Sequence, residues 1–201
     1  MLELIAVATI TLLAVISPGA DFAMVTRNSL LHGRAAGLLC ALGIAVGVLL
    51  HVAYAMLGVG LLLRQSPQWM AAVRLLGAAY LVYVGWQTFH ASAAAPPADE
   101  GSEGLSPWRA FRSGFFTNAL NPKTTLFVLS VYAQVVNALT PLAIRLGYGA
   151  FMSLAHLLWF AGVATVLSQP RLRQRLLACQ SVLNRGIGMV LAGLGVWLAL
   201  G

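Results

Sequence analysis

Charged residues are scarce in this sequence. Of its 201 residues, 8% are charged and 60% are hydrophobic, whereas a soluble domain carries about 25% charged residues to cover its water-facing surface. Two stretches, Ala35 to Leu63 and Leu142 to Ser168, contain almost no charge, and each could cross a hydrocarbon core of about 30 Å as a helix. The composition therefore excludes a soluble globular domain and predicts an all-α integral membrane protein.

Cysteine is also rare. Cys40 and Cys179 have neither the spacing of metal ligands nor the density of a disulfide framework. We therefore predict no metal site and no cofactor, and we interpret both cysteines as small apolar fillers. The net charge of +7 comes from basic residues scattered over short loops, which argues against a nucleic-acid partner.

A basic segment before the first hydrophobic run is missing. "LIAVATITLLAVI" has the length of a signal-peptide core, but Glu3 is the only charge near it, so we expect it to remain as the first span. Proline, glycine and charge divide the chain into six apolar segments. They cover approximately residues 2–26, 35–63, 67–90, 108–136, 141–168 and 180–200.

The six segments form two similar halves within one transmembrane domain, residues 1–201. A linker rich in Ala, Pro and Gly, residues 91–107, separates residues 1–90 from residues 108–201. Since each half has three spans, the second must be inverted relative to the first. The matching landmarks are Pro18 with Pro122, His51 with His156, and Arg74, Gly77 and Trp86 with Arg185, Gly188 and Trp197.

Arginine counts predict the orientation. Loops on the cytoplasmic side of membrane proteins carry an excess of Lys and Arg. With the N-terminus outside, eight arginines fall on the inner side and three on the outer side, so we predict that both termini lie outside. The outer set is Arg64, Arg74 and Arg145, and the inner set is Arg27, Arg34, Arg109, Arg112, Arg171, Arg173, Arg175 and Arg185.

Two prolines interrupt hydrophobic segments at corresponding places. Ser17-Pro18-Gly19 interrupts the first segment and Asn121-Pro122 the fourth. Proline removes an amide donor and clashes with the preceding turn, and freed backbone groups at membrane depth are tolerated only against protein or a water-lined cavity. Broken helices in inverted repeats are typical of secondary transporters, so we predict a polar cavity between the halves.

Charges of opposite sign follow the two breaks. Asp21 comes after the first break and Lys123 after the second. A zwitterion could place its ammonium near Asp21 and its carboxylate near Lys123. Alternatively, Asp21 caps a helix, and Lys123 snorkels or pairs with Asp21 as a structural contact. Ser17, Asn118 and Asn121 either join this site or support the broken backbone.

Two histidines lie within predicted spans. Histidine ordinarily changes its charge near neutral pH, so His51 and His156 could relay protons, or they could be hydrogen-bonded packing residues. The spacings Gly33-x-x-x-Gly37 and Gly43-x-x-x-Gly47 permit close helix approach and leave a homodimer open. Candidates for lining the cavity are Phe22, Tyr54, Phe116, Gln134 and Trp159.

The motifs at the breaks resemble a known family. "SPGADFAMVTRNSLLHGRAAG", "FRSGFFTNALNPK" and the closing "NRGIGMVLAGLGVWLAL" resemble the LysE/RhtB family of bacterial amino-acid exporters, and "TNALNPK" with "LSQPRLRQRL" resembles its threonine and homoserine branch. The resemblance implies six spans, amino-acid efflux across the bacterial inner membrane, and proton coupling. It assigns the family's motif residues to Pro18, Asp21, Asn118, Asn121, Pro122 and Lys123.

Two positions depart from the family pattern. Ala20 stands where a second proline is usual, which softens the first break. Asn184 stands where an aspartate commonly precedes the arginine of the last span, and this removes an ion-pair partner of Arg185. A proton-coupling scheme that uses this position is therefore placed in doubt.

The sequence thus predicts an exporter of small neutral amino acids, such as threonine or homoserine, that works by proton antiport. Its expected partners are the amino acid, protons and the lipid bilayer. A membrane-embedded enzyme would need a nucleophile with a base or a metal cluster, and the motifs H-E-x-x-H and G-x-S-x-G are absent. A scaffold protein would leave the paired charged breaks unexplained.

Overall fold

Helices make up nearly all of the described chain. The computed structural model describes residues 2–65, 67–90, 105–136 and 139–200, so most of the predicted linker lies outside the described residues. No strand occurs in these ranges, which confirms the all-α prediction. The helices are α1 (Leu2–Ile16), α2 (Ala20–Gln65), α3 (Pro67–Phe89), α4 (Pro107–Ala119), α5 (Pro122–Gln134), α6 (Leu142–Leu167) and α7 (Pro170–Leu200).

Both predicted helix interruptions are present. Helix α1 ends at Ile16 and α2 begins at Ala20, so Pro18 lies between two helices. Helix α4 ends at Ala119, and α5 begins at Pro122, a position where proline is favoured because its missing amide would have no partner in the helix. The two prolines therefore separate helices as the sequence predicts.

The turn between the first two predicted segments is tighter than expected. Helical structure continues beyond residue 26, and the chain bends at Gly33, whose φ is 81° and ψ 178°. Residues with a Cβ rarely adopt this φ. Gly33 therefore serves the bend and not the close helix contact that its spacing with Gly37 suggested, because nothing lies within 4 Å of the position a Cβ would occupy.

The last helix is longer than predicted. Helix α7 begins at Pro170, about ten residues before the expected start near residue 180. The arginines at the start of this helix indicated a loop, but a helix can continue past the apolar core into the polar interface. Cys179 lies on this added part and is exposed, so its interpretation as a packed filler is wrong, whereas Cys40 is buried as predicted.

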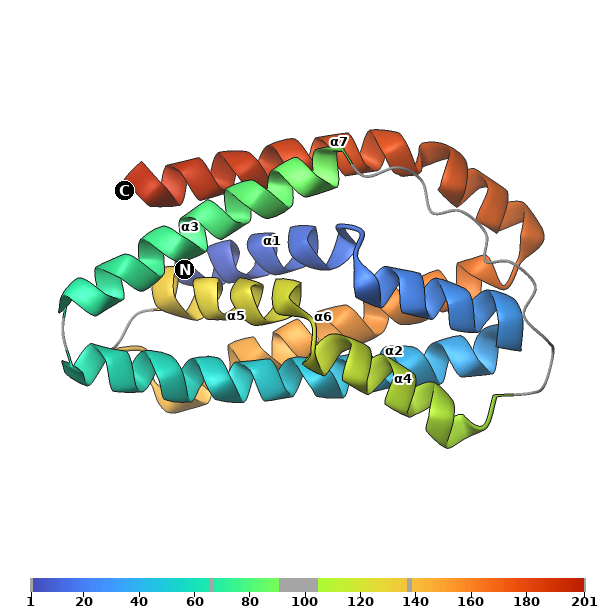
Figure 1. Cartoon of the computed structure of the whole chain (residues 1–201), viewed down its shortest axis with the longest axis horizontal. Coiled ribbons are helices and arrows are strands. Elements are labelled where there is room, and N and C mark those ends of the chain that lie inside the picture. Colours follow the sequence, from blue (N-terminus) through green and yellow to red (C-terminus); the bar gives the residue numbers. More distant parts are fainter. Residues whose placement is uncertain (1, 66, 91–104, 137–138, 201) are drawn as a thin grey trace.

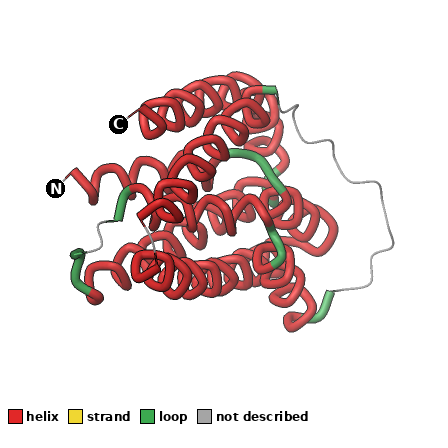
Figure 2. The backbone as a smooth tube through the Cα atoms, turned by 60° about the vertical axis from the view of Figure 1, so that its left-hand side comes forward, coloured by secondary structure: helices red, strands yellow, loops and turns green. Residues whose placement is uncertain are grey.

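The helices lie in layers. Helices α3 and α7 run side by side along one edge of the bundle, α1 and α5 lie next to them, and α2, α4 and α6 form the opposite side (Figure 1). The view turned by 60° shows the helices joined by short loops over the described residues (Figure 2). Both termini lie at the same end of the bundle.

Glycines allow helices α2 and α4 to approach closely. A Cβ at Gly43 of α2 would lie 2.1 Å from the backbone oxygen of Phe111 in α4, and one at Gly114 of α4 would lie 2.0 Å from the backbone oxygen of Cys40. A Cβ at Gly47 would lie 2.7 Å from Oδ1 of Asn118. The predicted use of Gly43 and Gly47 in close helix contact is confirmed, and the contact lies within one chain.

Two described stretches are long and apolar enough to cross a membrane. They are Ala20–Gly58, with a mean hydropathy of 2.3, and Leu142–Leu167, with a mean hydropathy of 1.8. Helices α4 and α5 have 13 residues each, and each is shorter than the roughly 20 residues that one span requires. Six spans would require α1 with the first part of α2, and α4 with α5, to cross the membrane as one span each. The six-span topology therefore stays a prediction.

The interior contains two apolar clusters and a set of buried polar residues. One cluster includes Val7, Val52 and Met152, and the other includes Val25, Ile44 and Phe160. On α6, His156 falls between Met152 of the first cluster and Phe160 of the second. The buried polar residues at this level include Ser17, Asp21, His51, Asn118, Asn121, Thr124 and His156.

Candidate functional site

The first break exposes backbone carbonyls that Lys123 binds. The Lys123 ammonium donates to the Ser17 and Pro18 carbonyl oxygens, each at 3.0 Å, and to Ser17 Oγ. Ser17 Oγ in turn donates to the Ala14 carbonyl at 3.0 Å. An ammonium has three donors, so these contacts use all of them. The ammonium also lies at the negative end of the α1 dipole, where a cation is stabilised.

The second break is held by asparagines. Asn121 caps α5, because its Oδ1 accepts from the Lys123 amide at 3.0 Å. The amide of Asn121 donates to the Asn118 carbonyl at 2.8 Å. These contacts satisfy backbone groups that the interruption would otherwise leave unpaired. Asn121 therefore supports the break, and it also lines the cavities described below.

Asp21 is bound by the opposite half of the chain. Its Oδ2 accepts a hydrogen bond of 2.8 Å from Asn118 Nδ2, which also lies 3.2 Å from Thr124 Oγ1. Asp21 is 7% exposed, and its Oδ1 has no hydrogen-bond partner among the described residues. No direct ion pair joins Asp21 to Lys123 in the described part of the chain. One carboxylate oxygen is therefore left available for a ligand.

The two histidines occupy different positions. His51 contacts the Asn118 carbonyl through Nε2 at 2.9 Å and Thr125 Oγ1 through Nδ1 at 3.2 Å, so it contacts both sides of the second break. His156 donates from Nδ1 to the Met152 carbonyl at 2.7 Å and lines the same cavity as Asp21. In the neutral ring this leaves Nε2 of His156 as an acceptor.

A small inner cavity lies between the breaks. It is lined by Ser17, Asp21, Lys123, Thr124 and His156 among others, with Phe22 and Phe160 supplying apolar wall. Its volume is about 20 Å³, counted as room for the centre of a water molecule. A single water needs about 10–15 Å³ on this measure. The inner cavity has room for a water or two but is too small for an amino acid.

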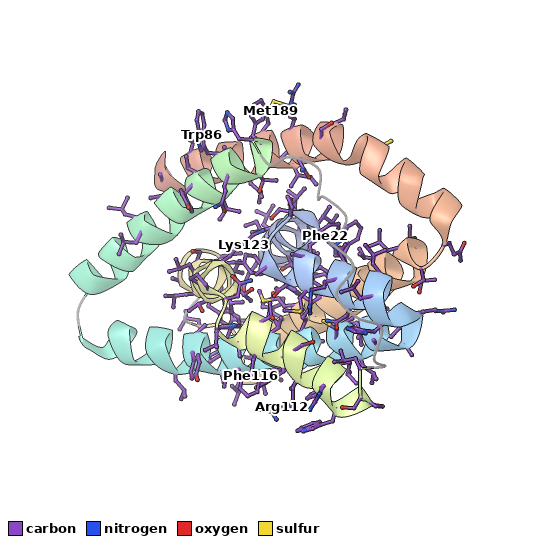
Figure 3. The ribbon with its side chains drawn as sticks, turned by 45° about the vertical axis from the view of Figure 1, so that its right-hand side comes forward. Phe22, Trp86, Arg112, Phe116, Lys123 and Met189 are labelled. Carbon is purple, nitrogen blue, oxygen red and sulfur yellow. The ribbon has the colours of Figure 1, made fainter. Side chains whose placement is uncertain are left out.

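A larger outer cavity adjoins it. This cavity has a volume of about 1110 Å³ and is open to the outside. Gly19, Asn121 and Lys123 line both cavities. Lys123 lies at the centre of the bundle near Phe22, while Trp86 lies on the α3 edge (Figure 3). Helix α3 contributes Tyr83, Trp86 and Gln87 to the outer cavity, and His90 follows directly after the helix.

Sequence reasoning found the charged core of this site and missed other parts. Thr124 and Thr125 follow Lys123 directly, and their position beside the motif was the available signal. Of the candidates for lining the cavity, Phe22 is confirmed. Tyr54 and Phe116 are 55% and 47% exposed and, like Trp159, they line neither described cavity. The side chain of Gln134 lies outside the described residues.

Two broken helices that meet at a buried acid and a base, with cavities on either side of the base, define the class of secondary membrane transporters. Comparison with known proteins agrees with that class. Residues 12–201 match the LysE type translocator family, and the chain belongs to this family. It is therefore a multi-pass transporter of the bacterial inner membrane and not an enzyme.

Relatives extend over most of the chain. It is 31% identical to the membrane protein YahN of Escherichia coli over 87% of this chain and 79% of YahN. It is 28% identical to the threonine efflux protein of Salmonella typhimurium over 100% of this chain and 98% of that protein. The leucine efflux protein of Salmonella choleraesuis is 32% identical over 63% of this chain and 60% of its own length. No solved structure matches the chain.

Proposed function

We propose that this transporter exports small neutral amino acids of the threonine and homoserine type, driven by proton entry. Its membership of the LysE family and its relatives named for threonine and leucine efflux support an amino-acid cargo. The observation that carries the proposal is the free Oδ1 of Asp21, buried in a cavity whose other charged group is Lys123. A zwitterion matches such a pair.

Charge balance favours neutral amino acids over basic ones. Among the described residues that line the inner cavity, Asp21 is the one carboxylic acid and Lys123 the one lysine or arginine. An α-ammonium and an α-carboxylate would each meet an opposite charge, whereas a lysine or arginine side chain would bring an unpaired charge into a site of low dielectric. Burying an unpaired charge costs roughly several kcal/mol of free energy. Small neutral side chains avoid this cost.

Proton coupling is proposed at Asp21. A proton on its carboxylate weakens the attraction for the substrate ammonium, so proton and substrate compete, as antiport requires. His156 lines the same cavity and is the better candidate for the relay. His51 uses both ring nitrogens at the second break, which favours a supporting role. Three further residues support the site. Ser17 accepts a hydrogen bond from Lys123, Asn118 donates one to Asp21, and Asn121 caps α5 at the second break.

The proposed mechanism is alternating access between two inverted halves, residues 1–90 and 108–201. In support, the broken pair α1 and α2 corresponds to the broken pair α4 and α5 in helix order. The part of α2 after Gly33 then corresponds to α6, and α3 to α7. Each half contributes one charge to the inner cavity, so a relative movement of the halves would change access to both charges at once.

The test is amino-acid exchange in proteoliposomes preloaded with unlabelled substrate. Labelled threonine, homoserine, leucine and lysine are compared at two pH gradients. We expect gradient-dependent exchange of the neutral amino acids and little exchange of lysine. Asp21→Asn should lower the gradient-dependent rate at least about tenfold, which corresponds to about 1.4 kcal/mol, because the amide cannot carry the proton.

Glu3→Gln is the matched control. Glu3 is also an acid on a membrane helix, but it accepts hydrogen bonds from Thr140 at 3.1 and 3.2 Å and does not line the inner cavity. Its substitution should leave coupling intact. Absence of flux for all four amino acids would contradict the exporter proposal, and a fully coupled Asp21→Asn variant would move the proton site elsewhere.

A further inference from the structure

Lys123 separates two cavities of very different size. The inner cavity beside Asp21 has about 20 Å³, and the outer cavity beside α3 about 1110 Å³. Both are lined by Lys123 and Gly19. A Cβ at Gly19 would lie 3.4 Å from Cδ and from Nζ of Lys123, so the lysine side chain lies directly against this glycine. Lys123 and Gly19 therefore belong to a wall that the two cavities share.

All three donors of the lysine are engaged in this state. They bind Ser17 O, Ser17 Oγ and Pro18 O. A substrate carboxylate therefore cannot bind Lys123 unless it replaces at least one of these contacts. A carboxylate attracts the ammonium more strongly than a carbonyl does, because it carries a full negative charge where the carbonyl oxygen carries only a partial one.

The outer cavity fits an amino acid better than the inner one does. No carboxylate occurs among its described lining residues, while Lys123 supplies a positive charge. Leu126 of α5 and Trp86 of α3 supply apolar surface, and the Trp86 and His90 rings lie 4.1 Å apart between centroids. Gln87 supplies a polar side chain. Apolar walls with few polar groups are typical of small-molecule sites.

We propose that the outer cavity is a separate binding site for the amino acid, in which the α-carboxylate meets Lys123 and the side chain lies against Trp86. Withdrawal of Lys123 from the α1 carbonyls then joins this site to the inner cavity and lets the α-ammonium reach Asp21. The inference rests on the proposed function, since it adds an entry site to the same transporter. It assigns substrate selection to residues of α3.

The first test compares two tryptophans. Trp86 and Trp197 are 66% and 65% exposed, but only Trp86 is among the residues that line the outer cavity. We expect Trp86→Ala to raise the half-saturation concentration for leucine and threonine exchange about tenfold, in line with the large share of binding energy that aromatic anchors carry. Trp197→Ala should match the wild type.

The outcomes separate this inference from the proposed function. If wild-type protein exchanges amino acids and the two variants have the same half-saturation, the outer site is refuted and the exporter proposal stands. If wild-type protein exchanges none of them, the exporter proposal fails first. The tryptophan comparison then has no readout, so a second measurement of binding alone is needed.

That measurement is protection of a cysteine in the outer cavity. Gln87→Cys is made together with Cys179→Ser, because Cys179 is exposed and Cys40 is buried. The purified protein is treated with a water-soluble maleimide in the presence of threonine or of threonine amide, which lacks the carboxylate. We expect threonine to slow labelling at least about threefold and the amide to have no effect. Failure to label, or equal rates with both compounds, would overturn the proposal.

Discussion

Asn118 connects both breaks through its side chain and its backbone. The side-chain amide donates to Asp21 of the first half at 2.8 Å, and the backbone carbonyl accepts from the Asn121 amide at 2.8 Å and contacts His51. It is fully buried. Because a Cβ at Gly47 would lie 2.7 Å from its Oδ1, Asn118 needs glycine opposite it. The geometry of Asp21 therefore depends on a residue from the other half.

Asn118→Ala should damage both stability and transport. The change leaves Asp21 Oδ2 without its donor, and an unpaired buried polar group costs about 1–3 kcal/mol, with more for a charged one. We expect a lower unfolding midpoint in detergent and loss of most proton-coupled exchange. The carboxylate is no longer oriented toward the inner cavity in this variant.

Asn28→Ala is the matched control for that experiment. Asn28 is 1% exposed and donates to the Met24 carbonyl and to Ser113 Oγ, but it lines neither cavity. It should lose stability by a similar amount and keep substrate coupling. Equal loss of exchange in both variants, once corrected for folded protein, would mean that Asn118 acts only through stability.

At the scale of helices, close contact between α2 and α4 positions the second break. Gly43 on α2 meets the backbone of α4 at Phe111 and Phe115, and Gly114 on α4 meets the backbone of α2 at Cys40. Contacts between backbones leave no room for side chains, so the distance between these helices is narrowly determined. Since α4 ends just before Asn121, this contact also determines where α5 starts.

Gly43→Ala should therefore separate α2 from α4. The new Cβ would lie 2.1 Å from the Phe111 oxygen and 2.7 Å from the Phe115 amide nitrogen, and overpacking of this kind costs about 1–3 kcal/mol. A lower thermal midpoint, measured in detergent, is expected. Gly162→Ala on α6 is the control, because nothing lies within 4 Å of its Cβ position. A midpoint unchanged in Gly43→Ala would show that the helices tolerate separation.

At the scale of the whole molecule, both termini lie at one end of the bundle (Figure 1). This arrangement requires an even number of membrane crossings if both ends leave the membrane on that side. Six crossings fulfil the condition when α1 with the first part of α2, and α4 with α5, each count as one. The distribution of arginines predicts that this end lies on the side of the membrane facing away from the cytoplasm.

Reporter fusions test that orientation. Alkaline phosphatase, which is active only outside the cytoplasm, should be active when fused after Gly201 or within the connection between α2 and α3. It should be inactive when fused within residues 91–104. Strong activity of the fusion in residues 91–104 would invert the predicted orientation, and a mixed pattern within one half would contradict the six-span topology.

The sequence by itself determined the class of protein and the chemistry of its centre. Scarcity of charge predicted membrane helices, and proline chemistry predicted the two breaks, because both effects act within a few residues of their cause. The charges of Asp21 and Lys123 were visible for the same reason. Helix α7 was predicted too short, because charge at a helix end does not distinguish a loop from a helix that leaves the membrane.

Only the tertiary structure decided how these groups combine. Lys123 binds the carbonyls of the first break and not Asp21, while Asp21 is bound by Asn118. Residues about a hundred positions apart in sequence meet in these contacts, and neither spacing nor composition encodes which partner each will find. The outer cavity formed by α3 is likewise a product of packing, because a cavity exists only where distant helices fail to fill the space between them.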